Sequence, residues 1–162
     1  MIIVSNTSPL TSLAAIGQFA LLQHIFGEVH ISEAVWEELN ADGVRWPGQD
    51  AVATSTWIHR HPMTDEPLVR SLMRSIDQGE AESIALAVRL RADLVILDDR
   101  DAREAAEALG LTVTGVLGIL LRAKRKGLLP LVRPVLDALR SQAGFFLSDK
   151  VYLHTLRLAG ED

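Results

Sequence analysis

The chain has 162 residues, a length that fits one domain with a sizeable buried core, and we expect a single domain over residues 1–162. Its apolar share of 48% and charged share of 23% are ordinary for a globular protein, and the absence of cysteine excludes disulfides and thiolate metal sites. The net charge of −5 argues against a broad basic surface for nucleic acid, although it is compatible with a small acidic site that holds a divalent cation.

Short apolar runs alternate with stretches of helical spacing along the chain. The apolar runs predict strands, and the 3.6-residue spacing predicts helices. In chain order we expect strands at 2–4, 29–31, 56–61, 94–97 and 112–114. We expect helices at 8–26, 33–39, 77–91, 101–109, 115–126, 131–142 and 148–158.

Local residues mark several of these boundaries. Ser8 can cap the first helix and Pro9 suits its first turn, while Ser32 caps the second helix. Glycine and proline predict a loop at 40–48 and a break at 62–67. The N-terminus has no basic segment before its apolar run, so we expect no signal peptide and a cytoplasmic protein.

Strands that alternate with helices predict a three-layer α/β/α sandwich with a central parallel sheet of four or five strands. In such sheets, ligands bind outside the carboxyl ends of the strands. This rule selects two polar clusters: residues 6–8 after the first strand, and Asp98 with Asp99 after the strand at 94–97. If these two strands are neighbours in the sheet, the clusters lie close together.

Further acidic residues can join this site. Glu37 and Glu38 lie in the second predicted helix, and Glu80 and Glu82 lie in the first turns of the third. Carboxylates that gather at one place disfavour each other's ionisation, and a hard divalent cation with oxygen ligands removes that cost. Mg²⁺ or Mn²⁺ would then orient a water molecule and stabilise charge on a phosphate. The acids therefore predict phosphodiester hydrolysis.

Each of these residues also has a structural interpretation. Glu80 follows Asp77 by three residues, a spacing typical of a capping box, and Asp98 with Asp99 can cap the helix that follows them. Asn6 can be a turn former that bonds its own backbone. Glu80 and Glu82 lie about 200° apart around a helix, so both cannot point at one site. Glu37 is expected to be a solvated surface residue.

Six segments together resemble a known family in their order and spacing. The chain is similar, over nearly its whole length, to the PIN-domain superfamily and, within it, to a prokaryotic subfamily related to the VapC-type toxin ribonucleases. The resembling segments are IIVSNTSPL at the start, ISEAVWEEL, DQGEAESIALA, LVILDDRDAREAA, GVLGILLRAKRKGLL and GFFLSDKVYLHTLRLAGE. The resemblance implies Mg²⁺- or Mn²⁺-dependent hydrolysis of RNA, a small antitoxin as partner, and a homodimer.

The resemblance also implies a set of site residues. The four acidic positions of the family fall on Asn6, Glu38, Glu80 and Asp98, which would ligate the metal, with Glu82 as the alternative for the third position. By the same resemblance, Asp98, Asp99 and Glu80 would be catalytic. Asn6 and Asp99 would complete the site and position the attacking water.

Asn6 departs from the family pattern, which has an aspartate at this position. An amide oxygen can still ligate a cation, but it brings no charge, so metal affinity and activity should fall. A second function therefore stays open: a catalytically weak or inactive PIN-fold module that binds nucleic acid or a protein partner. The chain contains neither a Gly-x-Gly-x-x-Gly nor a Gly-x-Ser-x-Gly motif, which argues against a dinucleotide oxidoreductase and a serine hydrolase.

Overall fold

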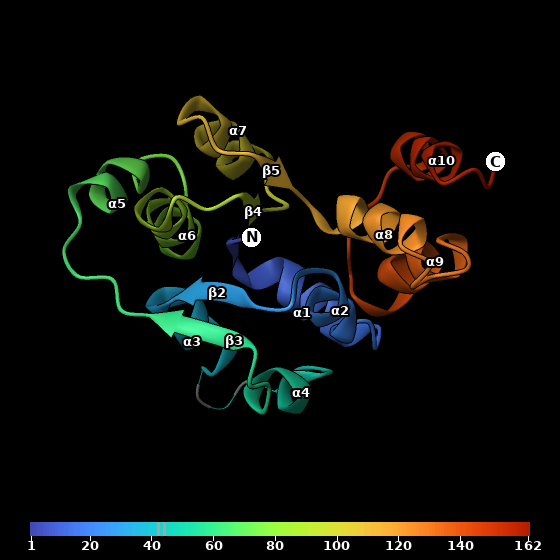
Figure 1. Ribbon diagram of the computed structural model, residues 1–162, viewed down its shortest axis with the longest axis horizontal. Coiled ribbons are helices and arrows are strands. Elements are labelled where there is room, and N and C mark those ends of the chain that lie inside the picture. Colours follow the sequence, from blue (N-terminus) through green and yellow to red (C-terminus); the bar gives the residue numbers. More distant parts are fainter. Residues whose placement is uncertain (42, 44) are drawn as a thin grey trace.

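The computed structural model describes residues 1–41, 43 and 45–162. Within that part of the chain, five strands form one parallel sheet in the order β3-β2-β1-β4-β5 (Figure 1). The strands are β1 (Ile3–Ser5), β2 (Val29–Ser32), β3 (Ile58–His61), β4 (Leu94–Ile96) and β5 (Val113–Thr114). The predicted α/β fold with a central parallel sheet is confirmed.

Helices connect successive strands along the chain and follow the last strand. The bounds of the described helices are α1 (Thr7–Ala15), α2 (Ala20–Phe26), α3 (Glu33–Leu39), α4 (Gln49–Ala53), α5 (Pro67–Leu72), α6 (Gln78–Leu90), α7 (Arg100–Ala108), α8 (Val116–Arg125), α9 (Arg133–Gln142) and α10 (Asp149–Leu158). None of the helices in the described ranges is long and apolar enough to cross a bilayer.

The first predicted helix is in fact two helices. It begins at Thr7, one residue before the predicted cap Ser8, and the chain turns at Gly17, where φ is 72°. Glycine adopts such a backbone conformation more readily than any other residue. The spacing of apolar residues did not reveal this break, because Leu13 of α1 and Leu22 of α2 are both buried in the same core.

Two short helices were not predicted. The loop predicted at 40–48 includes positions 42 and 44, which lie outside the described residues, and α4 begins directly after it. Pro67 does not end a segment as expected but begins α5, since a proline in the first turn loses no helical hydrogen bond. None of the residues of α5 is buried, which explains why no apolar spacing marked it.

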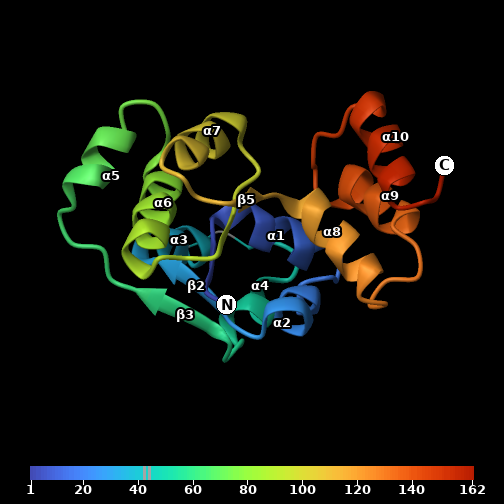
Figure 2. The same ribbon diagram turned by 45° about the horizontal axis from the view of Figure 1, so that its top comes forward.

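The sheet separates two hydrophobic clusters. Ile3 and Ile96 pack on one face with residues of α1, α2, α8 and α9, whereas Val4 and Val95 pack on the other with α6 and α7. Successive strand residues point to opposite faces, so these buried runs need a helical layer on each side. Figure 2 shows α5, α6 and α7 grouped apart from α1, α2 and α8.

The strands β1 and β4 are neighbours, with Ser5 in register with Ile96. The backbone N–H of Asn6 donates to the carbonyl of Ile96 at 3.1 Å, which continues the pairing beyond β1. The N–H of Leu97 donates in turn to the carbonyl of Thr114 at 2.9 Å. Asn6 and Asp98 therefore leave the sheet at the same edge, as the sequence predicted for neighbouring strands.

Candidate functional site

Asn6 occupies the N-cap position of α1 without capping it. Its side chain makes no capping hydrogen bond, and it is only 7% exposed. Within the described residues, its buried Oδ1 has no hydrogen-bond partner. The interpretation of Asn6 as a turn former that bonds its own backbone is therefore wrong, and the amide oxygen is available to a ligand.

Asp98 is held from one side by the start of α8. Its Oδ1 accepts the N–H of Val116 at 2.9 Å, while its buried Oδ2 has no partner among the described residues. Burial raises the pKa of Asp98, and the Val116 hydrogen bond and the Arg103 guanidinium act in the opposite direction. Gly115 permits this arrangement, because a Cβ at that position would lie 2.7 Å from Oδ1.

Gly115→Ala is expected to lower the free energy of unfolding by about 1–3 kcal/mol through overpacking against Asp98. The backbone of Gly115 has φ of −117°, which alanine adopts readily, so the cost is steric. Urea unfolding of Gly115→Ala in the native and in the Asp98→Ala background measures it. The cost should shrink when Asp98 is shortened, and an equal cost in both backgrounds would show that the two groups do not compete for space.

The two glutamates at the start of α6 have different environments. Glu82, 6% exposed, accepts the N–H of Ala34 at 3.0 Å through Oε1 and the amide of Gln78 at 3.0 Å through Oε2. It thereby satisfies a donor at the start of α3. Glu80, 8% exposed, has a buried Oε2 without a partner among the described residues. Of the two, Glu80 is the one available to a ligand.

Burial raises the pKa of Glu80 to about 8, helped by the carboxyl groups of Asp77 and Asp99. Asp77 caps α6 by accepting the N–H of Glu80 at 2.8 Å, as the capping interpretation predicted. This cap uses the backbone N–H of Glu80, so the Glu80 carboxyl group takes no part in it.

In a chelator, the free energy of unfolding is expected to fall as the pH rises from about 5 to 8. Glu80 titrates near 8 in the folded protein and near its ordinary 4.5 in the unfolded chain, so the folded state binds more protons throughout this window. Glutamine does not ionise, so Glu80→Gln should flatten the dependence of the unfolding free energy on pH. Urea unfolding at pH 5, 6.5 and 8 measures this, with the exposed Glu37→Gln as control. Parallel profiles for all three proteins would contradict the raised pKa.

Glu38 faces the beginning of α6 from α3. Its Oε2 accepts a hydrogen bond from the hydroxyl of Thr7, and a Cβ on Gly79 would overlap its Oε1. Burial raises the pKa of Glu38, the Thr7 hydrogen bond lowers it, and the charges of Asp77 and Glu82 raise it again. Because Gly79 has no side chain, the Glu38 carboxylate of α3 can approach the first turn of α6, where Glu80 also lies.

Asp99 has a structural role that the sequence predicted. It is the N-cap of α7 and accepts the N–H of Ala102 at 3.1 Å. Its charge also contributes to the raised pKa of Glu80, so the two carboxyl groups are near each other. Asp99 can therefore cap α7 and also lie beside Glu80.

The donor set suits a hard divalent cation. Five buried side-chain atoms lack a partner in the described ranges, and three of them are Asn6 Oδ1, Glu80 Oε2 and Asp98 Oδ2. An unpaired buried polar atom costs about 1–3 kcal/mol, which a bound cation would recover. Across the same ranges, no three His, Asp or Glu side chains are close enough to enclose an ion. Mg²⁺ commonly takes one or two carboxylates and completes its shell with water, so the arrangement fits it.

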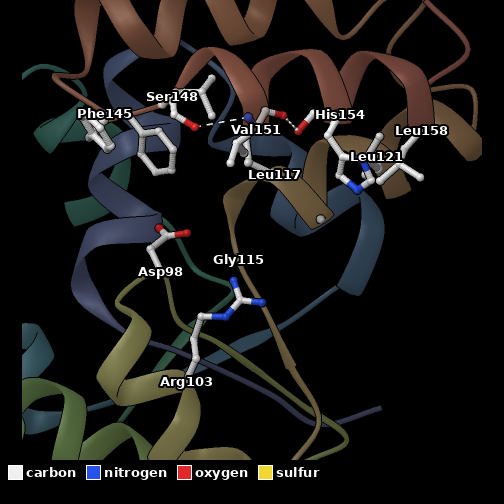
Figure 3. A pocket seen from close by; sticks show the side chains of 14 residues that line it. Asp98, Arg103, Gly115, Leu117, Leu121, Phe145, Ser148, Val151, His154 and Leu158 are labelled. Atoms are coloured by element: carbon white, nitrogen blue, oxygen red, sulfur yellow. Dashed lines mark hydrogen bonds between the residues drawn. The ribbon is translucent and has the colours of Figure 1, made fainter.

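Two cavities meet at Asp98, and the sequence analysis identified neither. One, of about 360 Å³, lies between α8, α10 and the segment 145–147, with Asp98 and Arg103 at one end (Figure 3). The other, of about 620 Å³, includes Asp98, Asp99 and Arg100. The adjacent pair Phe145 and Phe146, which lines both cavities, was a usable signal in a chain with only 5% aromatic residues.

A comparison with protein families matches residues 2–161 to the family DUF3368, whose description is PIN domain. No curated protein matches the chain. The matched range includes both strand ends and all the acids described above, and the parallel sheet flanked by helices agrees with that family's fold. The chain therefore belongs to the PIN-domain family.

Proposed function

We propose that this protein hydrolyses RNA phosphodiester bonds with the help of Mg²⁺ or Mn²⁺. The observation that carries the proposal is a set of buried oxygens, at Asn6, Glu80 and Asp98, that have no partners among the described residues of a PIN domain. Asn6 and Asp98 follow neighbouring strands, and Glu80 lies near Asp99. Nuclease-type folds of this family generally depend on a divalent metal, and every donor in the set is an oxygen, as Mg²⁺ and Mn²⁺ prefer.

The ligands would come from Asn6, Glu38, Glu80 and Asp98, with one or two of these carboxylates contacting the ion directly and water completing its shell. A bound ion would lower the pKa of a water molecule and stabilise negative charge on the phosphate. The chain itself contributes a carboxylate, Asp99, whose cap of α7 fixes its orientation beside Glu80. In the hydrolysis, the water oxygen forms a bond to phosphorus while the bond to the leaving oxygen breaks. Asp99 and Glu80 would position the water and accept its proton, and the leaving oxygen takes up a proton.

The finer parts of the proposal follow the resemblance to toxin ribonucleases. They are a small antitoxin that blocks the site, a homodimer, and a cytoplasmic location. Asn6 supports a second candidate function, a PIN-fold module that binds nucleic acid or protein but turns over slowly or not at all. An amide in place of a carboxylate leaves the site with one negative charge fewer to hold a cation.

The test is calorimetric titration of Mn²⁺ into the native protein and into Glu80→Gln and Glu37→Gln, with cleavage of a mixed RNA pool followed in parallel. Glu37 is exposed and neighbours Glu38 on α3, so its variant removes the same charge outside the donor set. We expect native and Glu37→Gln protein to bind Mn²⁺ and cleave RNA, and Glu80→Gln to do neither.

Absence of both binding and cleavage in the native protein would reject the nuclease proposal in favour of the binding module. Binding and cleavage that persist unchanged in Glu80→Gln would remove Glu80 from the site. An equal loss in Glu37→Gln would show that overall charge, rather than the donor set, governs metal binding.

A further inference from the structure

The cavity between α8 and α10 has the composition of a pocket for a flat apolar group. Leu117 and Leu121 of α8 form one wall, and Val151 and Leu158 of α10 form the other. Figure 3 shows Asp98 and Arg103 across the cavity from the α10 side chains. A ligand seated between the helices would therefore reach the acidic site with its polar end.

Phe146 stands at the junction of this cavity with the one beside Asp99. It is 90% exposed, the largest exposed fraction among the large apolar side chains of the described residues, and this exposure is costly for an aromatic ring. Its neighbour Phe145, by contrast, packs against the core. The packing of Phe145 thus fixes the backbone that carries Phe146, and the exposed ring of Phe146 lines both cavities.

The charges around the two cavities fit a phosphate. Arg100 and Arg103 lie one turn apart on α7, a spacing that places them on one face of the helix. Arg103 lines the cavity between α8 and α10, and Arg100 lines the other. Each of the two cavities that include Asp98 therefore has one guanidinium in its lining, which can contact a phosphate next to the scissile bond.

We propose that the cavity between α8 and α10 takes an unstacked base of single-stranded RNA, with Phe146 stacking on a base and Arg100 and Arg103 contacting the adjacent phosphates. The proposal rests on the ribonuclease function above and adds to it a base-binding subsite between α8 and α10. The chain carries a net charge of −5, so it gains little affinity from the RNA backbone. Stacking on an aromatic ring does not depend on that charge and is available only to bases that have left a duplex.

The test uses a fluorescently labelled single-stranded RNA hexamer containing 2-aminopurine, and the duplex of the same sequence, both in a chelator so that no cleavage occurs. Anisotropy gives the dissociation constants, and 2-aminopurine quenching reports stacking. The variants are Phe146→Ala and Phe146→Trp. Leu153→Ala is the matched control, because Leu153 is 56% exposed on α10 but does not line the cavity.

We expect Phe146→Ala to weaken single-strand binding by about five- to 150-fold and to abolish quenching. Phe146→Trp should retain both, and Leu153→Ala should bind as the native protein does. The duplex should bind more weakly than the single strand in every case. Mn²⁺ affinity should be the same in Phe146→Ala and the native protein, because Phe146 contributes no ligand.

Equal binding of the hexamer by Phe146→Ala and native protein, or equal binding of duplex and single strand, would overturn the base site. A native dimer that dissociates in Phe146→Ala with unchanged RNA binding would also overturn it, since the ring would then cover a second copy of the chain. Loss of hexamer binding in Phe146→Ala without any metal-dependent cleavage by native protein would reject only the nuclease proposal. Cleavage with unaltered binding in Phe146→Ala would reject only the base site.

Discussion

Asn6→Asp is expected to raise the affinity for Mn²⁺ by at least about tenfold and to speed RNA cleavage in proportion. The amide oxygen of Asn6 already lies buried and without a partner among the described residues, so the substitution changes the charge and little else. A carboxylate there would add a full negative charge next to the cation. Calorimetry with Mn²⁺ and initial cleavage rates measure the two effects.

The same substitution is expected to destabilise the protein when no metal is present. Asp98 already has its pKa raised by burial, and a second buried acid at the neighbouring strand end would repel it. In a chelator the unfolding midpoint should therefore fall, and Mn²⁺ should raise it by more than in the native protein. Gln23→Glu, on the exposed side of α2, adds the same charge elsewhere and should do neither. Equal Mn²⁺ affinity in Asn6→Asp and native protein would exclude Asn6 as a ligand.

The centre of the sheet was predictable because β1 and β4 are short, mostly apolar runs that are buried along their whole length. The rule that ligands gather at the carboxyl ends of parallel strands then selected Asn6 and Asp98 as candidates, and the pairing of β1 with β4 puts the two residues at neighbouring strand ends. The break at Gly17 was not predictable, since apolar spacing records which face is buried and continues across a turn when both helices share a core.

Choosing between Glu80 and Glu82 required the position of α3. The sequence showed only that the two side chains point in different directions on α6. Ala34 of α3 donates to Glu82, a contact between segments far apart in the chain, whereas Oε2 of Glu80 has no partner among the described residues. The close approaches of Gly79 to Glu38 and of Gly115 to Asp98 are of the same kind, because each depends on where a remote helix begins.

The arrangement of the histidines also could not be predicted from the sequence alone. No metal-ligand spacing such as His-Glu-x-x-His links them in the sequence, although His59 and His61 fall on one side of the predicted strand at 56–61. The structure places both on β3 beside His30 of β2, whose Nδ1 lies 2.8 Å from Nε2 of His61. Burial lowers the pKa of His30 and of His61, which favours an unprotonated ring nitrogen that can accept in such a hydrogen bond. The pairing of β2 with β3 brings His30 to the other two histidines, and spacing along the chain did not indicate that contact.

Asp98→Asn is expected to weaken Mn²⁺ binding by at least about 10–100-fold and to reduce cleavage by a larger factor, because it removes the charge of a ligand that also faces the substrate. Asparagine keeps an oxygen that can accept the N–H of Val116, so the start of α8 should stay in place. In a chelator, stability should not fall, because burial already disfavours the charged form of Asp98. Unfolding curves with and without Mn²⁺ separate the two effects.

Asp99→Asn is the matched control, since asparagine caps a helix as well as aspartate does and α7 should be unaffected. It should retain Mn²⁺ affinity and lose activity, because Asp99 is proposed to position the water and not to hold the metal. The double variant Asn6→Asp/Asp98→Asn moves the charge from one strand end to its neighbour. If both residues face one cation, Asn6→Asp should raise Mn²⁺ affinity by a larger factor in the Asp98→Asn background than in the native protein, because the two carboxylates no longer repel each other. Strictly additive effects of the two substitutions would mean that Asn6 and Asp98 do not share a site.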